Sequence, residues 1–425
     1  MIAMQKSNRD FSTQIINKLR NVFVDCFPIN DSALYSWGST SRREMGKNSD
    51  LDLFIIYNGK DIHKRINRFL SIVQSEFPNN KIDLLQKYTV SELIRIAKID
   101  GGDRQAITLS RLETDNNSLS EELSNKSREI LEDRYDKTRE LIYIMITLKR
   151  VYPFIFPGND IKFGDNGLRY LNYAFLFCRY IFEETENILD TQSALRKLKE
   201  EGVISGKLCD ECINASNFLF SLRNNLPIMA GINGNLLYMP QAALNKEDNS
   251  FENIYLNEFY AQKKVIKSLL DFLFPKTMEL LVNELGREET EVLDNLISGN
   301  SEKIGEDFEF LTSEIKSMVV SYCSSEKRIH EQLYEKYEQN WYVLFGIANN
   351  RMAESSILNR LVNPLGKSKK ILRLHQGFAW RNMYLYVARN PASNLETLNI
   401  IKNYKNAREM DIEAANASIY KKREK

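Results

Sequence analysis

Two aspartates two residues apart precede an apolar run, and their spacing suggests chemistry. Asp50 and Asp52 enter the segment Leu-Asp-Leu-Phe-Ile-Ile-Tyr. Because side chains alternate along a strand, both carboxylates would project from one face while Leu51, Leu53 and Ile55 pack into the core. Carboxylates this close repel each other unless a cation lies between them, which suits Mg²⁺, or Mn²⁺ in its place.

A third carboxylate and a glycine–serine turn flank this pair. Asp83 lies in a later apolar run, Lys-Ile-Asp-Leu-Leu, and is expected to face the same site. Three carboxylates can hold two metal ions about 3.5–4 Å apart, an arrangement that assists in-line attack on a phosphoryl group. The dipeptide Gly38-Ser39 predicts a turn whose backbone N–H groups approach nucleotide phosphates, with Arg42 or Arg43 neutralising more of their charge.

Lys162 and Arg169 flank a glycine-containing segment, Lys-Phe-Gly-Asp-Asn-Gly-Leu-Arg. Such a segment can fold over a bound nucleotide and bring two cations to its phosphates. It can equally begin a helix, with the glycines serving the turn and Arg169 forming a structural ion pair. The residues alone leave both interpretations open.

The elements that must position these residues form an α/β segment followed by helices. Few turn-forming residues, 18 glycines and 9 prolines, favour long helices. Apolar periodicity predicts helices over 11–27 and 63–77, strands over 33–37, 51–57 and 81–85, and further helices over 121–151, 167–184, 191–200, 207–225 and 254–273. Ser118-x-x-Glu121 has the pattern of a capping box at the start of the helical region.

The C-terminal part contains an internal repeat with a period of 40 residues. The segment 341–350 aligns with 381–390, so that Ala348 matches Ala388 and Asn350 matches Asn390. This period predicts stacked helix pairs. The segment 387–398 resembles leucine-rich-repeat-variant helical repeats.

Composition excludes several classes of protein. The 425 residues are 43% hydrophobic, and 58 Lys and Arg balance 57 Asp and Glu, so no global basic field is available to hold a long nucleic acid. The three histidines do not form a His-based zinc motif. The chain shows neither a signal-peptide pattern nor an apolar run long enough to cross a membrane, and we expect a cytoplasmic protein.

Two segments resemble known families. Residues 30–85, with Gly38-Ser39, Asp50-x-Asp52 and Ile-Asp83-Leu, resemble the DNA polymerase β-like nucleotidyltransferase superfamily. The segment 162–170 is similar to the Lys-Glu-Gly-Pro-Gly-Gly-Leu-Arg-Asp motif of PII-protein uridylyltransferases. It agrees at Lys162, Gly164, Gly167, Leu168 and Arg169, and it differs at Phe163, Asp165, Asn166 and Tyr170.

The second resemblance covers residues 30–275 and favours a role for Lys162 and Arg169 in the site. It does not extend to the family's metal-dependent phosphohydrolase domain, because no His-Asp pair occurs in the chain. The family's regulatory domains have no recognisable counterpart either, and the repeats stand in their place.

The predicted fold class is α+β and predominantly helical. A nucleotidyltransferase domain with a small mixed sheet is expected over 1–117, a helical domain completing the nucleotide cleft over 118–285, and C-terminal α-helical repeats over 286–425. The expected reaction transfers UMP or AMP from a nucleoside triphosphate to a protein side-chain hydroxyl and releases pyrophosphate. The repeats are expected to dock the protein acceptor.

In this interpretation, Asp50 and Asp52 bind both metal ions, and Asp83 binds the metal nearer the attacking group and acts as or positions the general base. Gly38 and Ser39 hold the triphosphate, with Arg42, Lys162 and Arg169 as supporting cations.

Two alternatives remain at the level of sequence. The first is a nucleotidyltransferase that modifies RNA ends or a small molecule, although the neutral net charge makes nucleic acid a less favoured partner. The second is a catalytically silent nucleotide-binding scaffold. The presence of all three carboxylates argues against the second.

Overall fold

The computed structural model describes residues 2–423 except 28, 46–48, 60, 81, 98–100, 116, 157–159, 183–187, 231–248, 302, 306–308, 310–312, 339, 364–377, 405–406 and 408. The chain forms two compact units, and each is described by itself. The first contains Met1–Arg95, Gln105–Lys137 and Phe156–Lys276, and the second contains Ile96–Arg104, Thr138–Ile155 and Thr277–Lys425. The three-part division at residues 117 and 285 stays a prediction.

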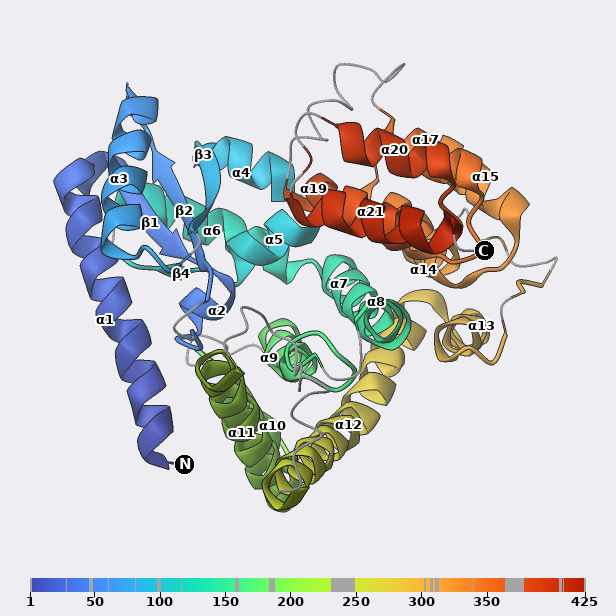
Figure 1. The fold of residues 1–425 in the computed structure, drawn as a ribbon, viewed down its shortest axis with the longest axis horizontal. Helices are drawn as coiled ribbons and strands as arrows, with labels where there is room; N and C mark the ends of the chain where they lie inside the picture. Colours follow the sequence, from blue (N-terminus) through green and yellow to red (C-terminus); the bar gives the residue numbers. More distant parts are fainter. Residues whose placement is uncertain are drawn as a thin grey trace. The chain divides into compact units, whose positions relative to one another are not determined.

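The first unit contains a mixed sheet (Figure 1). Its described strands are β1 (Ser32–Ser36), β2 (Leu51–Tyr57), β3 (Ile82–Tyr88) and β4 (Arg111–Leu112), in the order β3-β2-β1-β4. β1 pairs antiparallel with β2 and β4, whereas β2 and β3 are parallel. The three predicted β runs are confirmed, although residue 81 of the third lies outside the described residues.

Helices α1 (Ile2–Cys26) and α3 (Ile62–Glu76) pack on one face of this sheet. Leu51, Leu53 and Ile55 of β2 point into that core and are at most 1% exposed. This confirms the predicted alternation along β2. Because neighbouring side chains on a strand point to opposite faces, Asp52 lies on the other face of the sheet.

Helices make up most of the rest of the first unit. Those described are α2 (Gly38–Ser41), α4 (Val90–Ala97), α5 (Gly101–Thr108), α6 (Ser118–Glu132), α9 (Leu168–Ile181), α10 (Thr191–Glu200), α11 (Gly206–Ala230) and α12 (Asn249–Leu285), with a 3₁₀ turn at Ile29–Asp31. α4, α5 and α12 extend into the second unit. The prediction of a predominantly helical α+β protein is confirmed.

Three details differ from the sequence-based expectation. The capping box of α6 is formed by Asn117 and Ser120 rather than by Ser118 and Glu121, because the Asn117 side chain accepts the Ser120 N–H at 3.0 Å. The predicted helix over 121–151 is interrupted at Asp133, which has an extended backbone. α12 continues beyond residue 273 and through Pro275.

The second unit is built from helices. It contains α7 (Arg134–Ile146), whose first residues belong to the other unit, a π-helical turn at Thr147–Val151, α8 (Tyr152–Ile155), α13 (Arg287–Ser298), α14 (Glu314–Cys323), α15 (Lys327–Lys336), α16 (Trp341–Asn349), α17 (Ser355–Val362), α19 (Phe378–Arg389), α20 (Leu395–Asn403) and α21 (Glu409–Arg423). No described helix has the length and apolar character needed to cross a bilayer.

The 40-residue repeat corresponds to consecutive helix pairs, shown in orange and red in Figure 1. The Asn390 amide of one pair donates to the carbonyls of Ala348 and Asn350 in the preceding pair, at 2.9 and 2.8 Å. Asn350 donates in the same way to Ser321 and Ser324, at 3.0 and 2.8 Å. The pair α14–α15 is therefore a further copy of the repeat. A serine stands where the later copies have asparagine, so the alignment of the sequence with itself does not reveal this copy.

Candidate active site

The Gly38-Ser39 turn lies directly against Asp52. Gly38 has a positive φ of 59°, and a Cβ added there would lie 2.6 Å from Asp52 Oδ2, so this position requires glycine. The Trp37 N–H donates to the Asp52 carbonyl at 3.0 Å, and the Asp52 N–H donates to the Thr40 hydroxyl at 3.0 Å. The turn and β2 are thus joined on both sides of the glycine, with Ser39 half-buried beside it.

The three predicted carboxylates lie near the amino-terminal ends of the neighbouring strands β2 and β3. Asp52 and Asp83 are paired across the parallel strands β2 and β3, so their side chains share a face. Asp50 is exposed and immediately precedes β2. Burial raises the pKa of Asp52, the charges of Asp50 and Asp83 raise it further, and the cations Lys162 and Arg42 oppose this rise. These carboxylates therefore repel each other, as the sequence predicted.

Lys162 acts on this cluster from a loop that is closed by hydrogen bonds among its own residues. Asp160 Oδ1 accepts the N–H groups of Lys162 and Phe163, each at 2.8 Å, and the Arg169 N–H donates to the Lys162 carbonyl at 2.8 Å. Gly167 is required here because a Cβ would lie 2.6 Å from the Ile161 carbonyl oxygen. The motif found in the sequence is therefore a tight loop that presents one lysine.

Electrostatics connects Lys162 to the rest of the site. Burial lowers the pKa of Lys162, and the cations Arg223 and Arg169 lower it further, while Asp52 and Asp50 raise it. Arg169 therefore acts electrostatically on Lys162, although Arg223 has the larger effect, and a role for Arg169 in nucleotide binding stays a prediction. A buried lysine between carboxylates and arginines suits a site that receives an anionic ligand.

Arg223 is a member of this cluster that sequence reasoning missed. It belongs to α11, and its pKa is lowered by burial and raised by Asp50, Asp160 and Asp52. It lies in the pattern Ala215-x-x-Phe218-Leu-x-x-x-Arg223-x-x-Leu226, which resembles the helical region of the uridylyltransferases but assigns no role to the arginine. The one signal that could have found it is its position in the part of the chain that resembles the uridylyltransferases.

The two arginines after the turn have different partners. Arg42 Nε donates to Glu44 Oε2 at 2.7 Å, and its guanidinium lies over the Phe175 ring at 5.5 Å. Glu44 also accepts the N–H of Thr191 at 2.8 Å, so Arg42 is bound to the helical part of this unit. Arg43 instead pairs with the buried Glu113.

The donor set fits a hard divalent cation, since Asp50, Asp52 and Asp83 offer only carboxylate oxygens and repel each other without one. Among the residues that the structure describes, however, no three His, Cys, Asp or Glu side chains stand close enough to form a ready-made metal cage. Assignment of all three as metal ligands stays a prediction.

Comparison with known families agrees with this geometry. Residues 16–106 match the family described as nucleotidyltransferase domain, and residues 153–245 match the family described as GlnD PII-uridylyltransferase. A comparison with curated proteins found no similar sequence.

The chain therefore carries a nucleotidyltransferase domain of the DNA polymerase β-like superfamily. Within that class, its helical region resembles the PII-uridylyltransferases. Asp52 comes from the first matched segment and Lys162 from the second, so the two matches meet at one site within the first unit.

Proposed function

We propose that this protein transfers a nucleoside monophosphate, UMP or AMP, from a nucleoside triphosphate to the hydroxyl of a protein side chain. The observation that carries the proposal is the convergence at Asp52. The glycine turn, a second carboxylate from the neighbouring strand and a buried lysine from the uridylyltransferase-like loop all act on this one carboxylate.

In the proposed complex, the backbone of Gly38 and Ser39 holds the triphosphate, because the absence of a Cβ at Gly38 leaves room close to Asp52. Lys162, Arg169 and Arg42 supply positive charge to the phosphates. Arg223 joins them as a fourth cation, since it acts electrostatically on the same lysine and carboxylates.

Asp50, Asp52 and Asp83 would hold Mg²⁺, or Mn²⁺. When bound, such an ion neutralises phosphate charge and lowers the pKa of an attacking hydroxyl. The acceptor oxygen attacks the α-phosphorus, and the bond from that phosphorus to the oxygen bridging to the β-phosphate breaks, so pyrophosphate leaves. Asp83 takes the hydroxyl proton or orients the group that does.

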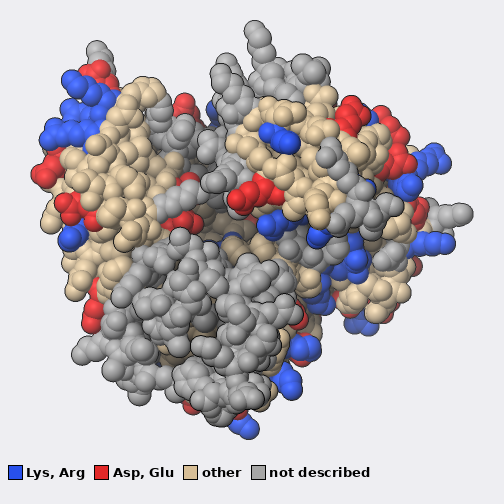
Figure 2. All heavy atoms as spheres, in the orientation of Figure 1, with Lys and Arg blue, Asp and Glu red and all other residues tan. Residues whose placement is uncertain are grey.

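The protein acceptor is supported by two features. The matched uridylyltransferases are described by their action on the PII protein. The second unit of this chain is a stack of helix pairs, an architecture that offers extended binding surfaces. Figure 2 shows acidic and basic side chains interspersed on the face in view, in keeping with the net charge of +1.

The test supplies each α-³²P-labelled nucleoside triphosphate with Mg²⁺ and cell extract to the full chain, and then asks where the label goes. We expect label in protein, absent from a variant carrying both Asp50→Ala and Asp52→Ala. Label in RNA or in small molecules alone would replace the protein acceptor with one of those classes. Nucleotide binding without any transfer would favour a catalytically silent scaffold.

A further inference from the structure

Glu113 is a buried carboxylate that none of the motifs contains. It follows β4, and its N–H donates to the Leu34 carbonyl at 2.8 Å, which extends the pairing of β4 with β1 by one residue. Its side chain is fully buried, and it accepts hydrogen bonds from the Ser36 hydroxyl, Arg43 and Arg20. A buried carboxylate with this many donors is fixed in one orientation.

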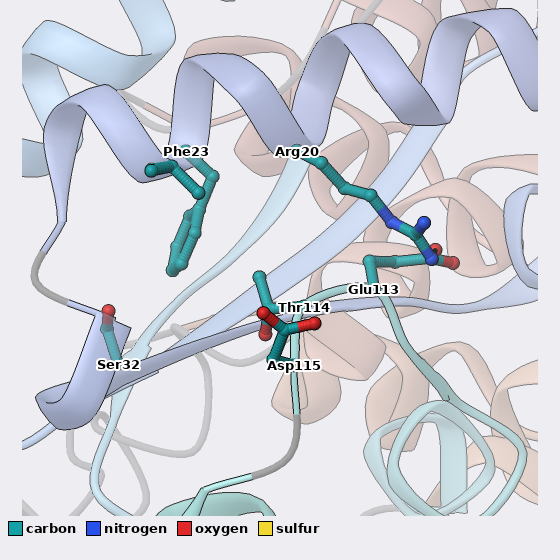
Figure 3. Close-up of a pocket in the computed structure, with 7 residues that line it drawn as sticks. Arg20, Phe23, Ser32, Glu113, Thr114 and Asp115 are labelled. Atoms are coloured by element: carbon teal, nitrogen blue, oxygen red, sulfur yellow. Dashed lines mark hydrogen bonds and ion pairs between the residues drawn. The ribbon is translucent and has the colours of Figure 1, made fainter.

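The pair with Arg43 is the strong one. Arg43 Nη1 donates to Glu113 Oε1 at 2.9 Å and Nη2 donates to Oε2 at 2.7 Å, a bidentate arrangement between side chains that are 9% and 0% exposed. Arg20 makes a single contact of 3.3 Å and is 42% exposed. Figure 3 shows Arg20 extending to Glu113 along one side of a pocket of about 220 Å³. Removing Arg20 therefore leaves the bidentate pair in place.

Arg43 connects Glu113 to the turn formed by Gly38–Ser41. Its Nη1 and its backbone N–H both donate to the Thr40 carbonyl, at 2.9 and 3.2 Å. The hydroxyl of the same Thr40, fully buried, accepts the Asp52 N–H. A continuous chain of hydrogen bonds thus runs from Glu113 through Arg43 and Thr40 to the backbone of Asp52.

Backbone strain supports a positioning role. Arg43 has a positive φ of 59°, which is unfavourable for a residue with a side chain. Such a conformation persists only where surrounding contacts impose it, and these residues concentrate at functional sites. Here the contacts that impose it are those with Glu113 and Thr40.

We propose that Glu113 is a positioning residue for nucleotide transfer, holding the Gly38–Ser41 turn against Asp52 through its ion pair with Arg43. This inference rests on the proposed function. Glu113 itself does not touch the substrate, and Arg43 is committed to the turn rather than to the phosphates.

The experiment measures nucleotide KM and kcat for label transfer in Glu113→Gln and Arg43→Lys, with Arg20→Gln as the matched control on the same carboxylate. We expect kcat/KM to fall by up to about 100-fold in the first two variants, because a displacement of about 1 Å costs that much. The nucleotide KM should rise about tenfold, because the displaced turn weakens ground-state binding. Arg20→Gln should keep both constants.

Partial unfolding gives a different result, since it lowers the active fraction and leaves KM unchanged. The variant with both Glu113→Gln and Arg43→Lys should lose no more than the worse single variant, because both changes break one link. Unchanged KM in the single variants, or losses that multiply in the double variant, would overturn the inference while leaving the transferase activity intact. Absence of label transfer by the wild-type protein would instead overturn the proposed function, and this inference with it.

Discussion

At the scale of single residues, the site depends on the absence of a side chain at Gly38. Gly38 combines a positive φ with an approach so close that a Cβ would lie 2.6 Å from Asp52 Oδ2. We therefore expect Gly38→Ala to displace the Asp52 carboxylate and to reduce label transfer by about 100-fold, with a loss of stability of only about 1–2 kcal/mol from the backbone strain. Steady-state label transfer and thermal unfolding measure the two effects.

A second glycine of the first unit provides the control. Gly202 has a positive φ of 69°, but a Cβ there would meet nothing within 4 Å. Gly202→Ala should cost the same strain and leave transfer unchanged. If both variants lost activity to the same extent, the loss would come from backbone strain rather than from the approach to Asp52.

The charge of Asp52 is costly to the folded protein. Burial, Asp50 and Asp83 raise its pKa above the ordinary value of 3.8, so the folded protein holds this proton more tightly than the unfolded chain. The stability that the folded protein gains by binding this proton is therefore fully present below pH 3.8. It is lost as the pH rises through the raised pKa of Asp52. Asp52→Asn removes this loss.

We expect Asp52→Asn to abolish label transfer and to raise the unfolding midpoint of the metal-free protein at pH 8, by ~2–4 °C for each kcal/mol of repulsion removed. Asp271→Asn, which changes an exposed carboxylate paired with Lys267, should alter neither property. An unchanged or lower midpoint for Asp52→Asn at pH 8 would show that the carboxylate is not strained in the absence of ligands.

At the scale of elements, the sequence predicted the strands and helices that depend on local side-chain patterns, but not the boundaries that depend on tertiary contacts. β2 was predicted from its alternation, because one face of the strand is buried in the core formed with α1 and α3. The end of α12 was predicted too early, since packing of the long helix outweighs the cost of Pro275. The N-cap of α6 lies one residue before the predicted position. Asn117 also donates to the Ser32 carbonyl at 2.8 Å, a long-range contact that the sequence does not reveal.

Between the helix pairs, a buried histidine makes the stack sensitive to acid. His330 is fully buried on α15, and its Nε2 lies 3.0 Å from the Asn350 amide nitrogen. That nitrogen belongs to an amide NH₂ group, which donates to two backbone carbonyls and has no acceptor site, so it cannot accept a hydrogen bond from a protonated Nε2. Burial lowers the pKa of His330 from 6.5 to about 4.

The unfolded chain therefore binds a proton between pH 6.5 and about 4 that the folded chain excludes, and stability falls as the pH decreases through this range. The loss from this group is at most about 3 kcal/mol. Urea unfolding of the second unit between pH 7 and 4 should show this loss in the wild type and in His63→Gln, which changes an exposed histidine. His330→Phe should lack that part of the pH dependence, and an identical slope in all three proteins would contradict the assignment.

At the scale of the whole molecule, the sequence predicted the motifs but not the contacts that join them. Asp50, Asp52, Asp83 and Lys162 were found because each lies in a short pattern with its own mechanical meaning. Glu113 lies in no such pattern, and the pattern that contains Arg223 gives that arginine no mechanical role. Their places follow from how α11 and β4 pack in the first unit. The compact units also differ from a division along the sequence, because the chain passes between them more than once.

The division into two compact units leads us to a prediction about ligand binding. Both family matches meet at a site within the first unit, so a nucleoside triphosphate with Mg²⁺ should stabilise that unit alone. At a ligand concentration of 100 times Kd, the gain is about 2.7 kcal/mol. Calorimetry should show two transitions, of which one moves upward with ligand.

Two glycine variants assign the transitions. Gly202→Ala adds strain to the first unit, and Gly346→Ala would press a methyl group from α16 against Ser321 and Tyr322 of α14 in the second unit. The transition lowered by Gly202→Ala should be the one that the nucleotide raises, whereas the transition lowered by Gly346→Ala should keep its midpoint. A ligand-induced shift of the latter transition would place nucleotide binding outside the Gly38–Asp52–Lys162 site, and a single transition would show that the two units unfold together.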